Sequence, residues 1–521
     1  MMKTTRRSVF RLFACLAGLA PLIASAELRL PPVFADDMVL QRDRANPIWG
    51  WDKPGAKVVV SIDAHSVTAT AQANGRWQVQ LPRLPARSEP LEIRIRSSAG
   101  SERFVRNVLV GEVWLFIGPS NIYWPVQRSN NADQEISSAD YPQIRFFTVA
   151  KGLADKPQPE CKGTWAVCSP KTVGPMSGIA YFFSRRIHQE TKVPIGVLQS
   201  YWGGSRVEAW TSLPALQSES ELRPILGSWD GLLAKKYDPA TAAAKHAAEL
   251  RTWRQNAATA KSAGRDAPRR PRKPADPAKS KDRPAALFNA MVAPLVPYGI
   301  RGIATYQGLG NLYWAEYSVP LLRAMTRDWR SLWQQERLPI GMVQPAPFPC
   351  GNWPKLRADA YSLQREAQLL IHDELSHIGI AATTDIGDLE ELHFTNKQEV
   401  GRRLAQWALA EVYGQPKAYS LPRFRALKTE GNRIRIHLHD TGGQLMTIDG
   451  KAPTHFQIAG KNGRFKTASA IIDGETIVLS HPEVPGPTHA RFGWSETAIP
   501  NLVNALGQPV SLFRTDDLRP D

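Results

Sequence analysis

The sequence predicts an α/β fold in which a parallel β-sheet with crossover helices lies between two regions built from strands. Three observations predict this arrangement. Residues 27–107 form short strand-like runs, residues 108–420 alternate strand-like runs with helical patterns, and residues 421–521 return to strand-like runs. A chain of 521 residues is also too long for one compact core. We therefore predict two or three domains.

The N-terminus has the pattern of a signal peptide. Basic residues within the first 11 positions precede an apolar stretch that reaches Ile23, and Ala24-Ser25-Ala26 follows as a cleavage site. We expect cleavage after Ala26, which removes residues 1–26. No later segment approaches the length needed to span a bilayer. We therefore expect an exported protein, periplasmic or extracellular, with no membrane association after cleavage.

Local signals place individual elements in the three regions. In the first region, residues 58–62 and 67–70 are strand-like, and Asn74-Gly75 is a hairpin turn signal before another strand. In the middle region, helical patterns cover residues 179–187 and 397–413. In the last region, apolar and polar residues alternate from 434 to 439, and Asp473-Gly474 marks a second hairpin.

A basic segment interrupts the middle region. Residues 235–283 hold 14 Lys or Arg residues and 5 Asp or Glu residues, so +9 of the formal net charge of +17 lies there. The segment is also rich in alanine and proline, as solvated linkers are. Such a charge could attract nucleic acid or another anionic surface. A flexible basic insertion explains the composition better, and we expect no nucleic-acid partner.

The cysteines leave two alternatives open. Cys15 lies in the predicted signal peptide, so Cys161, Cys168 and Cys350 remain. Cys161 and Cys168 are close enough in sequence to close a small disulfide loop, which export would permit. Two unpaired core thiols are the alternative. Three cysteines with no histidine nearby argue against a zinc site.

The most informative local feature is Ser120. An apolar strand at residues 108–117 stops at Gly118, and Ser120 follows two residues later. α/β hydrolases present a nucleophile in this way. The pattern is not Gly-x-Ser-x-Gly, which is absent from the chain, so the usual nucleophile elbow is excluded.

Three later segments supply the other groups that ester hydrolysis by a serine requires. Such a serine needs a base and hydrogen-bond donors for the oxyanion. Gly204 follows an apolar run at 193–198, Asn311 ends the segment 306–311, and His393 follows an acidic stretch. Taken singly, each is explained as well by a turn, a helix cap or a surface histidine. Their joint occurrence in this order favours a catalytic site.

With the segments around them, these residues resemble the sialate O-acetylesterase-like carbohydrate esterases of the SGNH hydrolase superfamily. The resemblance covers nearly the whole chain after residue 26. The segments that carry it are FADDMVLQR (34–42), VLVGEVW (108–114), GGSRVEAW (203–210), APLVPY (293–298), DWR (328–330), REAQ (365–368) and NK (396–397). One such segment would be a weak signal, but many in the right order are specific.

The resemblance implies both a fold and an activity. The fold is an SGNH-hydrolase (flavodoxin-like) three-layer domain with a parallel sheet at 108–420. An N-terminal β-sandwich domain at 27–107 precedes it, and a C-terminal β region at 421–521 follows it. The activity is removal of O-acetyl groups from carbohydrates, as in sialate 9-O-acetylesterases, through an acyl-enzyme intermediate. The implied partner is an acetylated carbohydrate, and the oligomeric state is left open.

The resemblance also assigns roles to the site residues. Ser120 is the nucleophile, His393 is the general base, and Glu391 orients the imidazole. The oxyanion hole consists of the backbone N–H groups of Ser120 and Gly204 and the side-chain amide of Asn311. No metal or organic cofactor is required.

Two further residues are implied to bind the substrate. These are Gln307, in the segment that ends at Asn311, and Arg206, which follows the glycines at 203 and 204.

Three segments of the chain depart from the family motifs. The family usually has Gly-Gln-Ser-Asn-Met-Glu-Trp at the nucleophile, and this chain has Gly-Pro-Ser-Asn-Ile-Tyr-Trp at 118–124. Leu309-Gly310 replaces a Glu-Ser pair before Asn311. Glu391 replaces an aspartate and is one methylene longer. Glu390 or a backbone carbonyl could orient the histidine instead. These changes make an inactive or weakened carbohydrate-binding relative the second hypothesis, and nucleic-acid binding through 235–283 is the third.

Overall fold

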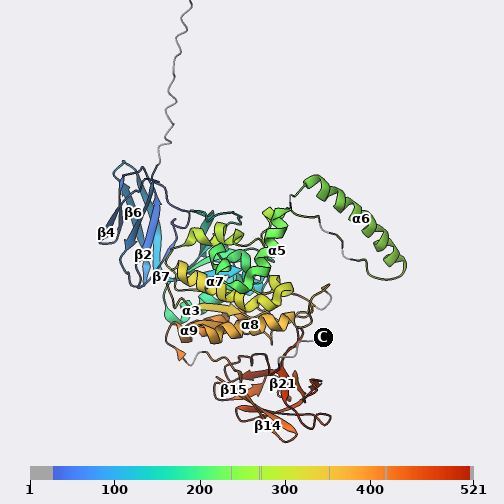
Figure 1. Ribbon diagram of the computed structural model, residues 1–521. Helices are drawn as coiled ribbons and strands as arrows, with labels where there is room; N and C mark the ends of the chain where they lie inside the picture. The colour runs from blue at the N-terminus through green and yellow to red at the C-terminus, as the bar shows by residue number, and fades with distance from the viewer. Residues whose placement is uncertain are drawn as a thin grey trace, which may run out of the picture.

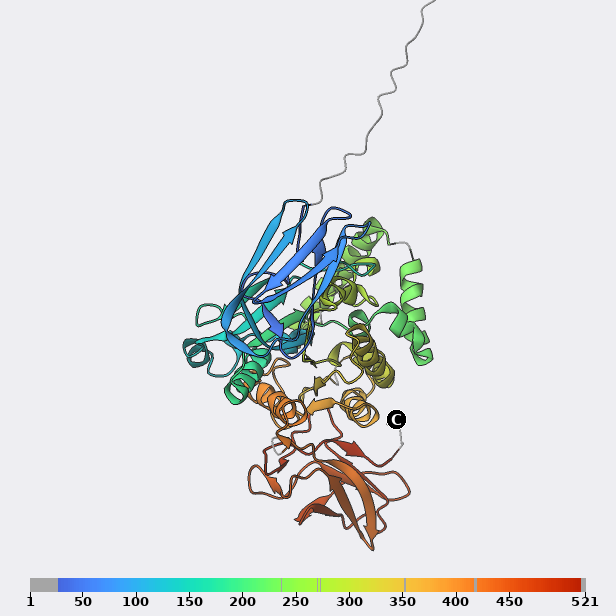
Figure 2. The ribbon, with the colours of Figure 1, turned by 90° about the vertical axis from the view of Figure 1, so that its left-hand side faces the viewer.

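The computed structural model describes residues 27–235, 237–268, 270–271, 273–350, 353–416 and 419–516. The predicted signal peptide at 1–26 lies outside the described residues. Helices occupy the middle of the molecule, and strands from the start and the end of the chain lie at opposite ends of it (Figures 1 and 2). The fold is mixed α/β, as predicted. Within the described ranges, no helix combines the length and the apolar character that crossing a bilayer requires.

The central sheet has the strand order β13-β12-β11-β7-β10-β8-β9. Its strands are β7 (Glu102–Gly118), β8 (Tyr141–Val149), β9 (Gly163–Cys168), β10 (Ile195–Tyr201), β11 (Gly302–Thr305), β12 (Ile340–Val343) and β13 (Ile378–Ala381). Neighbouring strands are parallel except β8 and β9, which are antiparallel. The sheet is therefore mixed and not wholly parallel as predicted, because the connection from β8 to β9 contains no crossover helix.

Helices cover both faces of this sheet. Successive side chains of β7 point to opposite faces, so Trp114 and Phe116 enter one apolar core while Leu115 and Ile117 enter the other. The first core is closed by α3 (Gly178–Thr191) and α9 (Lys397–Glu411), and the second by α7 (Ser318–Leu332) and α8 (Ala360–Glu374). The two helices predicted at 179–187 and 397–413 are confirmed.

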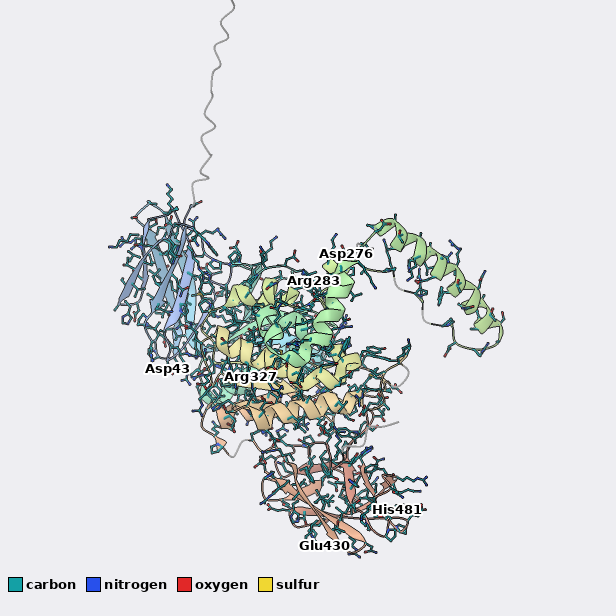
Figure 3. The ribbon with its side chains drawn as sticks, viewed as in Figure 1. Asp43, Asp276, Arg283, Arg327, Glu430 and His481 are labelled. Atoms are coloured by element: carbon teal, nitrogen blue, oxygen red, sulfur yellow. The ribbon has the colours of Figure 1, made fainter. Side chains whose placement is uncertain are left out.

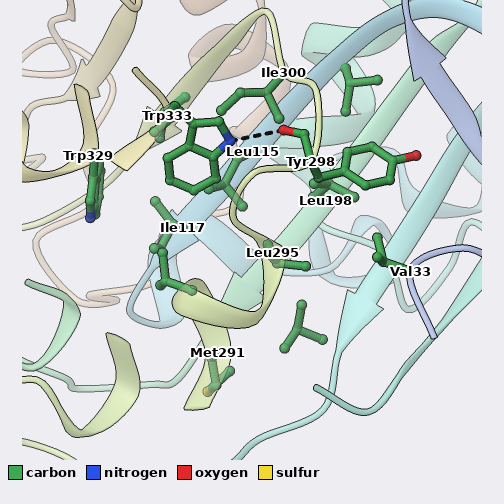
Figure 4. Packing of buried hydrophobic residues seen from close by; sticks show 14 of the residues in the cluster. Val33, Leu115, Ile117, Leu198, Met291, Leu295, Tyr298, Ile300, Trp329 and Trp333 are labelled. Atoms are coloured by element: carbon green, nitrogen blue, oxygen red, sulfur yellow. Dashed lines mark hydrogen bonds between the residues drawn. The ribbon is translucent and has the colours of Figure 1, made fainter. Parts of the chain in front are cut away.

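The second core holds the carboxyl half of β7 in place. Leu115 and Ile117 of β7 lie near Trp329 and Trp333 (Figure 4). The indole N–H of Trp333 donates to the backbone carbonyl of Tyr298 at 2.9 Å. A strand buried on both faces in this way has little freedom to shift, and its last residues are correspondingly well positioned.

The N-terminal strands form two groups. They are β1 (Val39–Gln41), β2 (Asn46–Trp51), β3 (Lys57–Ile62), β4 (His65–Thr70), β5 (Arg76–Leu81) and β6 (Arg87–Ser97). In the first group, β3 pairs with β4 and β6, and β6 also pairs with β7 of the central sheet. In the second group, β5 pairs with β2. Asn74-Gly75 is a turn, but the strand after it pairs with β2 instead of β4. β7 continues without a break across residue 108, the expected domain boundary.

The C-terminal strands have an apolar core of their own. One sheet has the strand order β14 (Arg423–Glu430), β15 (Arg433–His439), β20 (Thr476–Ser480) and β19 (Ser469–Asp473). A second sheet has the order β18 (Lys466–Thr467), β17 (Phe456–Ala459), β21 (His489–Phe492) and β23 (Phe513–Arg514). In addition, β16 (Leu445–Thr447) pairs with β22 (Leu502–Asn504). The predicted alternation at 434–439 is that of β15, and the predicted hairpin at Asp473-Gly474 joins β19 to β20.

The basic segment contains a long helix. After α5 (Arg223–Ala234), α6 (Pro239–Ser262) projects away from the rest of the molecule (Figure 1). Asp238 caps this helix through the backbone N–H groups of residues 240 and 241, and its alanines favour a helix. Asp276 and Arg283 mark the returning chain (Figure 3), where Arg283 pairs with Asp155 at 2.5 Å.

The three described cysteines are free and buried. Cys161 belongs to the apolar core on one face of the central sheet, and Cys168 belongs to the core on the other face. Of the two alternatives, the disulfide is therefore absent and the unpaired thiols are present. Burial raises the pKa of each thiol to about 12, so the thiols remain protonated at neutral pH.

Candidate active site

A sharp turn at the carboxyl end of β7 presents Ser120. Gly118 has a φ of +147°, which favours glycine, and a Cβ atom there would lie 3.1 Å from the carbonyl oxygen of Tyr306. Pro119 follows in an extended conformation, and Ser120 begins the short helix α1 (Ser120–Tyr123). The glycine and the proline thus turn the chain out of the buried sheet, and Ser120 becomes partly exposed.

His393 lies against this serine. The segment between β13 and α9 carries the imidazole, and its Nε2 atom lies 2.7 Å from Ser120 Oγ. The indole ring of Trp124 stacks on the imidazole, with ring centroids 4.6 Å apart and planes 7° apart. Trp124 has a positional role that the sequence analysis missed, although it ends the motif at 118–124. The structure therefore brings together two groups that are 273 residues apart in sequence.

Glu391 faces the other ring nitrogen of His393. Its Oε1 atom lies 3.4 Å from His393 Nδ1 and accepts a 2.9 Å hydrogen bond from the backbone N–H of His393. The longer side chain therefore folds back onto its own loop and reaches the ring at ion-pair distance. The backbone N–H of Glu390 donates to Asp388 Oδ1 at 2.8 Å. Of the two candidate carboxylates, Glu391 is the one placed beside the imidazole.

The surroundings of His393 favour its neutral form. Burial lowers its pKa below the ordinary value of 6.5, and the positive charge of Lys397 lowers it further. Glu391 acts in the opposite direction but does not offset the other two effects. A neutral imidazole at pH 7 has a free lone pair, so it can accept the hydroxyl proton of Ser120.

Two hydrogen bonds of Asn121 connect the turn that carries Ser120 to the segment that carries His393 and to the buried Lys397 at the start of α9. Lys397 has no exposed surface, and its Nζ atom donates to Asn121 Oδ1 at 2.9 Å. Asn121 Nδ2 in turn donates to the carbonyl oxygen of Leu392 at 3.2 Å. Burial holds the pKa of Lys397 well below 10.5. Asn121, the residue after the serine, is therefore held both by the residue before the histidine and by Lys397.

The loop after β10 lies beside Ser120. The backbone N–H of Trp202 donates to the carbonyl of Gly118 at 3.1 Å, and a Cβ atom on Gly203 would lie 3.4 Å from the Cβ atom of Ser120. Gly204 has a φ of +66°, and its carbonyl accepts a 2.8 Å hydrogen bond from Lys281 Nζ. The two glycines therefore bring bare backbone next to the serine.

Asn311 is fixed by two partners. It lies in η7 (Leu309–Tyr317), and its Oδ1 atom accepts a 2.9 Å hydrogen bond from the backbone N–H of Val207. Its Nδ2 atom donates to Glu208 Oε2 at 2.7 Å, which uses one of the two amide hydrogens. Burial raises the pKa of Glu208, while the bond from Asn311 and the charge of Arg206 oppose that rise.

The two expected substrate-binding residues have different environments. Arg206 is partly exposed, and its guanidinium lies 3.8 Å from Glu208 Oε1. Gln307 is 1% exposed and lies under the turn at Gly118. Its side-chain nitrogen and oxygen make no hydrogen bond within the described part of the chain.

Comparison with known proteins gives the family of the chain. No protein-family model matches it. It is 26% identical to the sialate O-acetylesterases of Pongo abelii and Homo sapiens over 437 residues, or 75% of this chain and 72% of each relative. It is 32% identical to a carbohydrate acetylesterase from Xanthomonas citri, whose crystal structure it matches with a TM-score of 0.79 over 94% of this chain and 100% of that chain. The chain therefore belongs to the sialate O-acetylesterase-like carbohydrate esterases, which are carboxylic ester hydrolases.

Proposed function

We propose that this protein is an exported serine esterase that removes O-acetyl groups from carbohydrates through an acyl-enzyme intermediate. The observation that supports this proposal most directly is the 2.7 Å contact between Ser120 Oγ and His393 Nε2. The names of the relatives indicate acetyl esters of sugars as the substrate class, and O-acetylated sialic acid is the first substrate to assay.

In the acylation step, Ser120 attacks the acetyl carbon. Neutral His393 takes the hydroxyl proton as Ser120 Oγ bonds to the carbonyl carbon, and negative charge develops on the carbonyl oxygen. The backbone N–H groups of Ser120 and Gly204 and the remaining amide hydrogen of Asn311 stabilise this oxygen. Each such donor contributes about 3 kcal/mol in comparable enzymes. The sugar oxygen then leaves with the proton from His393, and the acetyl group stays on Ser120.

In the deacylation step, water replaces the sugar. His393 takes a proton from the water, the hydroxyl oxygen attacks the acetyl carbon, and acetate leaves as Ser120 Oγ recovers the proton. Glu391, 3.4 Å from His393 Nδ1, stabilises the imidazolium that forms in both steps. No step requires a metal or an organic cofactor.

Neighbouring groups keep these residues in position. Glu208 and the backbone of Val207 fix both ends of the Asn311 amide, so the donor is oriented before the substrate binds. Trp124 restricts rotation of the His393 ring. Fixed donors and a fixed base lower the reorganisation that the transition state requires.

We further propose an SGNH-hydrolase (flavodoxin-like) domain at 108–420, with β-sandwich-type domains at 27–107 and 421–521. The order β10-β7-β11-β12-β13 supports this assignment, since it is the 2-1-3-4-5 order of flavodoxin-like sheets when β8 and β9 are treated as an addition. Ser120, Gly204 and Asn311 also follow the carboxyl ends of three adjacent strands, where ligands bind in such folds.

Trapping the intermediate tests the proposal. We expect that rapid acid quenching during turnover of p-nitrophenyl acetate leaves an acetyl group on the peptide that contains Ser120. Peptide mapping by mass spectrometry detects this group, and protein quenched without substrate is the control. Acetate release from O-acetylated sialosides should accompany it. Turnover with no acetyl group on this peptide, under conditions in which deacylation limits the rate, would contradict the proposal.

The pH dependence of kcat/KM provides a further prediction. The base acts when neutral, and its pKa is lowered below 6.5 by burial and by Lys397. Activity should therefore be full above that lowered pKa, and it should fall only as the pH drops through it. We expect the plateau to extend below pH 6.5 in initial-rate measurements.

A matched variant tests the cause of this shift. Glu391→Gln removes the charge that opposes the lowering, so its acidic limb should move to still lower pH. An acidic limb at or above pH 6.5 in the wild-type protein would contradict the environment described for His393.

A further inference from the structure

Two stacked tyrosines lie beside Ser120. Tyr123 is the last residue of α1, and its ring stacks on that of Tyr201 with centroids 3.5 Å apart and planes 9° apart. Both side chains are only partly buried. Tyr201 ends β10 in register with Gly118, the residue at which β7 turns toward the serine. The pair therefore comes from α1, which begins at the proposed nucleophile, and from the end of β10, the strand that pairs with β7.

The loop that follows Tyr201 places the pair at the site. Trp202 bonds to the carbonyl of Gly118, and Gly203 lies against the side chain of Ser120. The exposed Lys151 extends over this surface, with its Nζ atom 6.0 Å from the ring centroid of Tyr201 and 5.9 Å from that of Trp202. Three aromatic rings and one cation thus lie on the β10 side of the serine.

The residue at position 123 departs from the family motif. The family motif has glutamate at the position of Tyr123, so a charged side chain has been replaced by a ring. The contact with Tyr201 fixes the orientation of that ring, and a fixed aromatic surface loses little conformational entropy when a ligand binds. This arrangement suits a ligand with a flat face of C–H groups, because an aromatic face carries negative partial charge.

We propose that the Tyr123–Tyr201 pair binds the pyranose ring that carries the acetyl ester, and that Lys151 donates a hydrogen bond to an oxygen of the same sugar. This inference rests on the proposed esterase function, since it names the surface that holds the alcohol part of the substrate. The C–H face of a pyranose stacks on the rings while the acetyl group reaches Ser120. The pair therefore selects sugar esters over small acyclic esters.

The test compares two substrates and three variants, which are Tyr123→Ala, Tyr123→Phe and a control. The substrates are an O-acetylated methyl pyranoside and vinyl acetate, whose alcohol part contains no ring. The first variant is Tyr123→Ala. The control variant is Phe104→Ala. Phe104 is an aromatic residue with 37% of its surface exposed, but it lies 14 residues before Gly118 on β7, roughly 45 Å away along the strand.

Tyr123→Ala should lower kcat/KM for the pyranoside about tenfold, mainly through a higher KM, and should leave vinyl acetate hydrolysis unchanged. Tyr123→Phe should retain the wild-type value, because the ring and not the hydroxyl is required. Phe104→Ala should change neither substrate. An unchanged KM for the pyranoside with Tyr123→Ala, or an equal loss on both substrates, would overturn the proposal.

Binding measurements separate this proposal from the esterase function itself. Calorimetric titration of Ser120→Ala with the acetylated pyranoside measures sugar binding without turnover. Adding Tyr123→Ala to this variant should weaken binding about tenfold if the Tyr123–Tyr201 pair is the sugar-binding platform. Loss of binding in the double variant in the absence of any wild-type hydrolysis would support the platform and contradict the esterase function. Serine-dependent hydrolysis with equal binding by the two variants would contradict the platform alone.

Discussion

Replacing Ser120 with alanine is expected to lower kcat for acetate release by about 10⁴–10⁶-fold, because it removes the only atom placed to attack the acetyl carbon in the proposed mechanism. The oxyanion donors remain, so a small rate above that of the uncatalysed reaction should persist. The substitution removes one oxygen atom from a partly exposed side chain, and the melting temperature should change little. Acetate release and p-nitrophenyl acetate turnover both measure the effect.

A serine outside the site is the matched control. Ser137→Ala alters an exposed residue at the end of α2 (Ala132–Ser137) and should leave both rates unchanged. Equal rates for wild type and Ser120→Ala would end the case for this nucleophile. A wild-type protein that binds acetylated sugars without serine-dependent hydrolysis would instead favour the inactive-relative hypothesis. Restoring the family residues at positions 119, 309 and 391 should then increase the rate.

Replacing His393 with alanine is expected to lower kcat by at least about 10⁴-fold, since Ser120 would lose the base that takes its proton. The side chain of His393 is 25% exposed and lies against Trp124, so its removal leaves a slot that opens to solvent. Added imidazole should enter this slot and restore part of the rate. The measurement is kcat with and without imidazole.

The control for this variant is an exposed histidine in the C-terminal region. His439→Ala, at the end of β15, should retain the wild-type rate and show no response to imidazole. A His393→Ala protein that remains folded and keeps a rate within about twofold of wild type would contradict the role of the base.

The sequence allows prediction of those features that depend on local pattern. The buried strand before Ser120 follows from its continuous apolar run, and the alternation in β15 follows from its isoleucines at 434 and 436. The approach of Ser120 and His393 is also predictable, because residues that follow parallel strands meet at one edge of a sheet. The family resemblance indicated which serine and which histidine to consider.

Features that depend on competition between contacts could not be predicted. Glu391 bonds to the backbone N–H of His393 as well as facing its ring, and loop torsions decide that balance. The bridge from Lys397 to Asn121 joins two motifs that are 276 positions apart, and neither motif indicates that its side chain contacts the other. A turn signal at residues 74 and 75 predicts a reversal but not which strand pairs next. In the basic segment, the overall composition suggested a flexible insertion, whereas the N-cap at Asp238 and the alanines that follow it favour the helix α6.

The 17-residue length of β7 has a consequence for how the chain can be divided. Its first half hydrogen-bonds to β6, and its last residue precedes the Pro119-Ser120 turn by a single peptide bond. β1 also pairs with residues 109–111. Removing the residues before 108 would remove β1 and β6, the strands that hydrogen-bond to the strand β7 that presents Ser120. The N-terminal strands therefore support the strand that ends at the Ser120 turn, and a shortened protein prepared for activity measurements should retain them.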